Sequence, residues 1–188
     1  MMMSEKFEEK FSEKFGGHFG SRLGQQPSSR RLALYGILLA LTVIGANVKV
    51  LGSVAFDSAP AFLGTLLLGP VGGAILGAVG HLVSAALAGF PFTVPVHLAV
   101  AVLMALTMYA YGRVYGRFHD LTAWSYGASG VVAWFINVPF SLAVLYPVMQ
   151  DAVWVLLLPL SLVCIANLIV AGLIYSHLSS SIKARFTR

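Results

Sequence analysis

Long apolar segments separated by short polar ones fill the chain from Leu32 to His177. Six of them predict helices, at 32–48, 58–69, 70–88, 95–112, 122–146 and 153–177. A membrane-spanning helix needs about 20 mostly apolar residues, and most of these segments approach that length. The pattern therefore predicts an all-α, polytopic membrane protein with six transmembrane helices.

From Ser58 to Ala88 the chain carries no Asp, Glu, Lys or Arg, and only His81 can acquire a charge near neutral pH. As one helix, these 31 residues would extend about 46 Å, well beyond a hydrocarbon core of about 30 Å. Gly69-Pro70 divides the stretch, because proline cannot continue a helix without losing a hydrogen bond. We therefore expect a helical hairpin. Its first helix, 58–69, is so short that a re-entrant segment is the alternative to a full span.

Small residues form a stripe on the second helix of this hairpin. Gly69, Gly73 and Gly77 recur every four residues, and His81 continues the series. Glycine stripes allow neighbouring helices to approach closely, so they face protein rather than lipid. The stripe therefore predicts that the His81 side chain points into the bundle.

The composition agrees with a membrane protein. Of 188 residues, 58% are hydrophobic and 10% charged, and the mean hydropathy is +0.84, whereas soluble domains carry about 25% charged residues. The single cysteine, Cys164, excludes a disulfide within the chain. We expect one membrane domain at 32–180, preceded by a separate segment at 1–31 and followed by a basic tail at 181–188.

The N-terminal segment contains a repeated Glu-Lys-Phe triplet at 5–7, 9–11 and 13–15. Four-residue spacing keeps the phenylalanine rings near one face of a helix. This favours an amphipathic helix on the cytoplasmic leaflet, and a solvated, partly disordered tail is an equal alternative.

The distribution of cations predicts the orientation of the chain. Six Lys and Arg residues precede the first predicted helix, two lie between the fourth and fifth, and three follow the sixth. Eleven of the twelve therefore lie on one side, and Lys49 is the exception. The positive-inside rule then places both termini in the cytoplasm.

Eight polar or aromatic residues are candidates for binding a substrate in the outer half of the bundle. They are Asn47, Lys49, Asp57, His81, His97, Asn137, Tyr146 and Asn167. Polar groups at membrane depth are costly unless they face the bundle and have partners. Simpler roles stay open: hydrogen bonds between helices for the asparagines, a helix cap for His97, solvated charges for Lys49 and Asp57, and an interfacial aromatic belt for Tyr146.

One motif suggests an enzyme. Gly127-Ala128-Ser129-Gly130 resembles the motif of rhomboid intramembrane proteases, with His177 as the only candidate base nearby. Helix packing by small residues explains the same motif, so we predict no catalytic residue and no enzyme. The chain has no nucleotide-binding motif and no metal-ligand spacing, so we also predict no cofactor and no metal site. A membrane scaffold without a pocket is a third possibility.

The hairpin region resembles a known family. Phe56-Asp57-x-x-Pro60, followed by Leu66-Leu67-Leu68-Gly69-Pro70-x-Gly72-Gly73-Ala74 and Gly77, is similar to the substrate-binding S components of energy-coupling factor (ECF) transporters. The resemblance covers about residues 32–180. It implies high-affinity capture of a vitamin or vitamin precursor at a bacterial plasma membrane, with a transmembrane T subunit and two ATPase subunits as partners. Gly36-x-x-x-Ala40 is similar to the helix 1 motif that docks onto the T subunit.

Three short elements resemble the branch of the family associated with α-ribazole, a cobalamin precursor. They are Gly45-Ala46-Asn47-Val48-Lys49, Asn137-Val138-Pro139 and Ala166-Asn167. The residues alone are equally compatible with hydroxymethylpyrimidine, pantothenate or thiamine. Only Lys49 is basic on the outer side, which disfavours an anionic substrate. The metal-transporting relatives use a histidine next to the initiator methionine, so Met1-Met2-Met3 disfavours cobalt and nickel.

Overall fold

The computed structural model of the chain describes residues 29–46, 49–50, 54–55, 57–118 and 122–186. Residues 1–33 and 34–188 form two separate units, and the account below concerns the second. The predicted amphipathic repeat at 5–15 lies outside the described residues.

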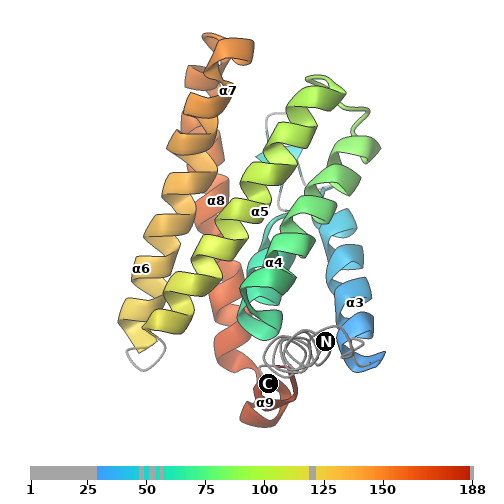
Figure 1. Cartoon of the computed structure of the whole chain (residues 1–188), viewed down its shortest axis with the longest axis vertical. Helices are drawn as coiled ribbons and strands as arrows, with labels where there is room; N and C mark the ends of the chain where they lie inside the picture. The colour runs from blue at the N-terminus through green and yellow to red at the C-terminus, as the bar shows by residue number, and fades with distance from the viewer. Residues whose placement is uncertain (1–28, 47–48, 51–53, 56, 119–121, 187–188) are drawn as a thin grey trace, which may run out of the picture. The chain divides into compact units, whose positions relative to one another are not determined.

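Helices make up nearly all of the described chain (Figure 1). The long ones are α3 (Ser29–Ala46), α4 (Ala59–Leu87), α5 (Val94–Arg117) and α8 (Ala152–His177). A π-helical turn, η2 (Ile136–Phe140), joins α6 (Thr122–Phe135) to α7 (Ser141–Met149), and a short helix, α9 (Ser180–Phe186), follows α8. Within the predicted loop after α3, the two-residue strands β1 (Lys49–Val50) and β2 (Val54–Ala55) pair antiparallel.

The element α4 consists of two helical limbs that fold back on each other. Gly69 breaks the helix with φ 84° and ψ 178°, a conformation that favours glycine, and Pro70 starts the second limb. A Cβ atom on Gly73 would lie 2.9 Å from the Cα of Thr65, and one on Gly64 would collide with Leu76. Thr65 therefore lies against Gly73, and Gly64 against Leu76, which confirms the predicted hairpin.

Five helices are long and apolar enough to cross a membrane, where the sequence predicts six spans. They are Ser29–Ala46, Ala59–Leu87, Val94–Arg117, Trp124–Met149 and Ala152–His177. The difference lies in the first limb of α4, since 59–68 extends only about 15 Å. Multiple spans are thus present, but a sixth complete span is not confirmed.

Two predicted helix ends are wrong, both at residues that usually break helices. The predicted loop at 112–121 begins too early, because α5 continues to Arg117. Gly112 instead serves packing: a Cβ atom there would lie 3.0 Å from the Cα of Pro70. Likewise, α7 continues through Pro147 to Met149. The basic tail predicted at 181–188 also contains most of α9.

The turn η2, which contains Pro139, interrupts the helix predicted at 122–146. Proline lacks the N–H that would bond to the carbonyl four residues earlier, which favours a wider turn. The Ser141 hydroxyl donates a hydrogen bond of 2.6 Å to the Ile136 carbonyl, five residues before it. Single π-helical turns change which side chains face the interior, and this one lies in the middle of the bundle.

On the side of η2 toward α9, the bundle is filled by aromatic and apolar side chains. Phe62 of the first α4 limb is fully buried and contacts the Tyr111 ring edge-on, with centroids 5.2 Å apart. Tyr115 lies 5.2 Å from Tyr126 and 6.2 Å from Tyr175, measured between ring centroids. We call Tyr111, Tyr115, Tyr126 and Tyr175 the tyrosine cluster. It joins α5, α6 and α8 near the end of the bundle where α9 lies.

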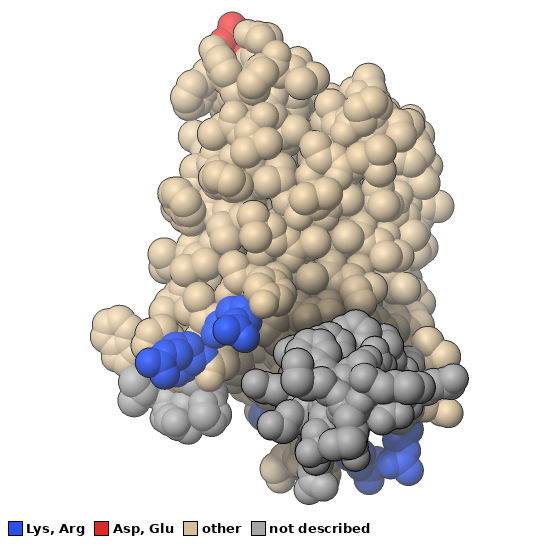
Figure 2. All heavy atoms as spheres, in the orientation of Figure 1, with Lys and Arg blue, Asp and Glu red and all other residues tan. Residues whose placement is uncertain are grey.

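Most charged side chains of the described residues in 57–186 lie at the two ends of the bundle, and Asp57 lines its interior. Arg113 and Arg117 lie in the last turns of α5, and Lys183 and Arg185 lie in α9. Asp151 lies between α7 and α8 at the opposite end. On the face drawn in Figure 2, uncharged surface separates blue residues at the α5–α6 end from one red residue at the α7 end. We call the first the cationic end. This distribution is typical of a bundle whose sides contact lipid.

Candidate functional site

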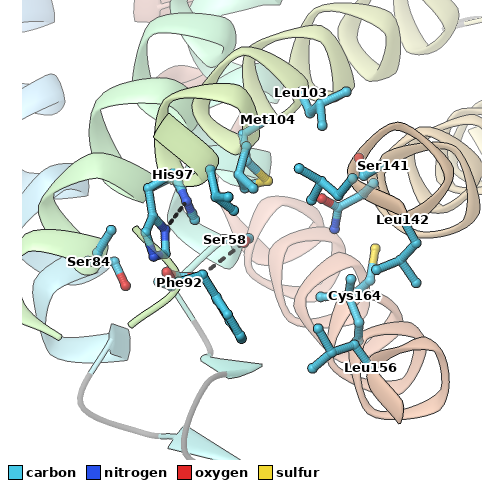
Figure 3. Close-up of a pocket in the computed structure, with 18 of the residues that line it drawn as sticks. Ser58, Ser84, Phe92, His97, Leu103, Met104, Ser141, Leu142, Leu156 and Cys164 are labelled. Carbon is cyan, nitrogen blue, oxygen red and sulfur yellow. Dashed lines mark hydrogen bonds between the residues drawn. The ribbon is translucent and has the colours of Figure 1, made fainter. Parts of the chain in front are cut away.

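A cavity of about 170 Å³ lies between the α4–α5 pair and the segments η2, α7 and α8. Its lining comes from the segments that flank α4, the second limb of α4, the first half of α5, η2, α7 and residues 156–167 of α8. Most lining side chains are apolar, including Leu103, Met104, Leu142 and Leu156 (Figure 3). Its polar lining consists of Asp57, Ser58, His81, Ser84, His97, Asn137, Ser141 and Asn167, together with the thiol of Cys164. A few polar groups in an apolar concavity are typical of a small-molecule site.

Two histidines form a hydrogen-bonded pair at one side of this cavity. His81 Nε2 lies 3.2 Å from His97 Nδ1, so the second limb of α4 and the start of α5 are joined here. The His97 ring is 7% exposed and lies 5.6 Å from the Phe90 ring and 6.3 Å from the Phe92 ring, between centroids. As predicted, His81 faces the interior of the bundle.

Asp57 contributes a carboxyl group to the same cavity from the segment before α4. It accepts a hydrogen bond of 3.1 Å from the Ser58 hydroxyl, and the Ser84 side chain also hydrogen-bonds to it. Burial raises the pKa of the Asp57 carboxyl, and these hydrogen bonds act in the opposite direction. The carboxyl is therefore held in place by the chain itself rather than by a described cation.

Asn167 connects the cavity to the start of the hairpin. Its side chain is 1% exposed, and its Oδ1 accepts a hydrogen bond of 3.0 Å from the backbone N–H of Ala59. The first N–H groups of a helix have no partner within the helix, so Asn167 satisfies one of them from α8. Asn167 thus makes the hydrogen bond between elements that the sequence left open, and it also lines the cavity.

The turn η2 brings Asn137 to the cavity, and Ser141 follows one turn later. The Asn137 side chain is within hydrogen-bonding reach of the Cys164 thiol on α8. Because Pro139 and the Ser141 hydrogen bond define this turn, the two polar groups depend on it for their position.

The structure thus brings five of the eight predicted site residues to one cavity: Asp57, His81, His97, Asn137 and Asn167. Tyr146 is not among the residues that line it, and its side chain is 43% exposed. Asn47 and the side chain of Lys49 lie outside the described residues. Gly36 and Ala40 are both exposed on α3, and a Cβ atom on Gly36 would meet nothing within 4 Å.

Sequence reasoning missed Ser58, Ser84, Ser141 and Cys164 as lining residues. Serine and cysteine are common inside membrane helices, where they pack or bond to their own backbone, so they carry little signal. The signal for Ser84 was present, because it follows His81 by three residues and so shares its helix face.

The arrangement around Ser129 does not favour a protease. The Ser129 side chain is fully buried, and its hydroxyl donates to the backbone carbonyls of Ser125 and Tyr126. His177 is exposed, and its Nδ1 lies 2.8 Å from the Leu173 carbonyl of its own helix. A serine nucleophile needs a base that takes its proton, and here the proton is committed to the backbone.

A comparison with protein families matches residues 30–179 to the ECF transporter, substrate-specific component. The chain belongs to this family. ECF substrate-specific components are membrane subunits of transporters rather than enzymes, and they capture a small-molecule substrate and work with T and ATPase subunits. No individual curated protein and no solved structure matches the chain.

Proposed function

We propose that this ECF component captures an aromatic vitamin or vitamin precursor outside the bacterial plasma membrane, and that α-ribazole is its substrate. The observation that carries the proposal is the cavity lined by Asp57, His81, His97, Asn137 and Asn167. α-Ribazole is a benzimidazole joined to a ribose. The apolar lining suits the rings, and the asparagine and histidine groups suit the ribose hydroxyls and ring nitrogen.

The charge distribution supports an outward-facing cavity. The lining residues lie in the half of the bundle remote from Arg113, Arg117, Lys183 and Arg185. Under the positive-inside rule, these cations mark the cytoplasmic side. The proposal therefore has both termini in the cytoplasm and the cavity accessible from outside.

The exposed face of α3 is the proposed docking site for the T subunit. Gly36 and Ala40 are one turn apart, so they share a face, and that face is not covered within residues 34–188. A small-x-x-x-small pair lets another helix approach closely. The same exposed face would be an unremarkable lipid contact in a protein that acts alone.

A binding measurement on the purified full-length chain tests the proposal. We expect α-ribazole to raise the thermal midpoint, since a ligand at a hundredfold excess over its Kd stabilises by about 2.7 kcal/mol. Hydroxymethylpyrimidine, thiamine and pantothenate serve as competitors. Saturable binding of one of these instead would refute the α-ribazole assignment. No saturable binding of any water-soluble vitamin or vitamin precursor would refute the capture function.

The single cysteine provides an independent readout. Cys164 lines the cavity and is 2% exposed, so a small thiol reagent reaches it only through the cavity or by opening of the bundle. Bound substrate should slow its modification. Equal modification rates with and without α-ribazole at saturating concentration would mean that the substrate binds elsewhere.

A further inference from the structure

Within the part of the chain that the structure describes, one buried nitrogen of the histidine pair has no hydrogen-bond partner. His97 Nδ1 is paired with His81, but among the described residues nothing bonds to His97 Nε2, although the atom is buried. Buried polar atoms nearly always have partners, and leaving one unmet costs about 1–3 kcal/mol. The side chain lines the cavity, so the missing partner is expected there.

The hydrogen bond between the two rings links their tautomers. A neutral imidazole has one donor and one acceptor nitrogen, so the single proton between His81 Nε2 and His97 Nδ1 fixes both rings at once. If His81 donates, both rings carry their proton on Nε2, which is the commoner tautomer of neutral histidine in water. His97 Nε2 is then an N–H donor, and the partner it lacks is an acceptor.

The rest of the lining restricts the charge and size of that partner. Among the described lining residues none is a Lys or Arg, and Asp57 brings a carboxyl group, so an anionic ligand would find no counter-charge. The cavity of about 170 Å³ is slightly larger than the engineered cavity of about 150 Å³ that takes benzene. One or two fused rings therefore fit the space between Met104 and Leu142.

We propose that His97 Nε2 donates a hydrogen bond to a ring-nitrogen acceptor of an uncharged aromatic heterocycle, and that His81 holds His97 in the tautomer that allows it (Figure 3). This inference rests on the proposed capture function and names the ligand atom that is recognised. Phe92 is 37% exposed and flanks the His97 ring, so it is the neighbour placed to move aside when the ligand enters.

A single-atom change in the ligand tests the inference on the unaltered protein. The two probes are α-ribazole and its analogue in which the unsubstituted ring nitrogen is replaced by C–H, each titrated calorimetrically into the full-length chain. We expect the analogue to bind about tenfold more weakly or worse, the loss that an unmet buried donor produces.

Two variants assign the effect to His97. In His97→Asn the amide can still pair with His81 but has no donor at the Nε2 position, so both probes should bind with equal, reduced affinity. In His97→Gln the amide nitrogen lies near the former Nε2 position, so part of the preference for the ring nitrogen should return. Melting curves establish that each variant is folded, and the wild-type comparison stands without them.

The outcomes separate the two proposals. Equal binding of both probes by the wild-type chain would overturn the inference and leave the capture function standing. An undiminished preference in folded His97→Asn would also overturn it, because another group would then recognise the nitrogen. Failure of the wild-type chain to bind either probe would overturn both the inference and the α-ribazole assignment.

Discussion

The close contact inside the α4 hairpin makes Gly73→Ala a sharp test of the fold. A methyl group at position 73 would lie 2.9 Å from the Thr65 Cα and 2.7 Å from its Cβ, so the backbone itself must move. Overpacking costs about 1–3 kcal/mol, and a clash with backbone atoms falls in the upper part of that range, about 2–3 kcal/mol. Alanine is favoured over glycine inside a helix by about 1 kcal/mol, which offsets part of the cost. We expect a net loss of about 1–2 kcal/mol.

Thermal unfolding of the purified chain in detergent measures this loss. For a protein of this size 1 kcal/mol shifts the midpoint by about 2–4 °C, so Gly73→Ala should lower it by about 2–8 °C. The matched control is Gly127→Ala on α6, where a Cβ atom would meet nothing within 4 Å. The control should unfold at the wild-type temperature or slightly above it, because it gains helix propensity without a clash.

Equal midpoints for the two alanine variants would refute the reasoning. They would mean that the two limbs of α4 are not in backbone contact at Thr65, and that the distance between the limbs is larger than in the structure. A partial recovery in Gly73→Ala combined with Thr65→Ala would instead support the contact, since Thr65→Ala removes the Thr65 hydroxyl group from the collision.

Three further predictions follow from the site and the docking face. Asn167→Ala should lower the thermal midpoint by about 2–10 °C, because it removes the acceptor of the Ala59 N–H in a buried position; Ser176→Ala, on an exposed serine of α8, should have no effect, and equal midpoints would contradict the cap. Gly36→Leu should abolish uptake in cells that contain the T and ATPase subunits, while substrate binding stays unchanged. Loss of binding would contradict the docking role. The control Val131→Leu, on α6, should alter neither uptake nor binding. The Asp57 carboxyl has a raised pKa, so it favours the folded state most at low pH and loses that contribution as pH rises through its folded-state pKa. The thermal midpoint of wild type minus that of Asp57→Asn should therefore fall with increasing pH. A difference that rises or stays constant would contradict the burial of the carboxyl.

The hairpin could be predicted from the sequence because its cause is local. Gly69 and Pro70 break the helix by their own backbone chemistry, whatever surrounds them. Gly112 gave the opposite result, because tertiary packing decided its role. Gly112 is small so that Pro70 can approach α5, and no pattern along α5 itself reveals a neighbour more than forty residues away in sequence.

The site was predictable to the extent that burying polar groups in an apolar bundle is costly. Asp57, His81 and Asn167 stand out in their segments because a membrane helix tolerates such groups only with partners. Their individual partners were not predictable, since these depend on how α8 meets the start of α4. Tyr146 stood out for a different reason, because its ring is amphipathic. Such a ring is equally well accommodated on an exposed surface, where Tyr146 lies.

The tyrosine cluster has a consequence for how cargo leaves. Phe62, Met108 and Tyr111 are fully buried or nearly so. The rings of Tyr115, Tyr126 and Tyr175, from three helices, pack together nearer the cationic end. A substrate bound beside His97 would therefore meet packed side chains, and not an open channel, on the side of the cationic end. We expect the substrate to leave through the same opening by which it entered. Release into the cell then requires the whole subunit to reorient until that opening faces the cytoplasm.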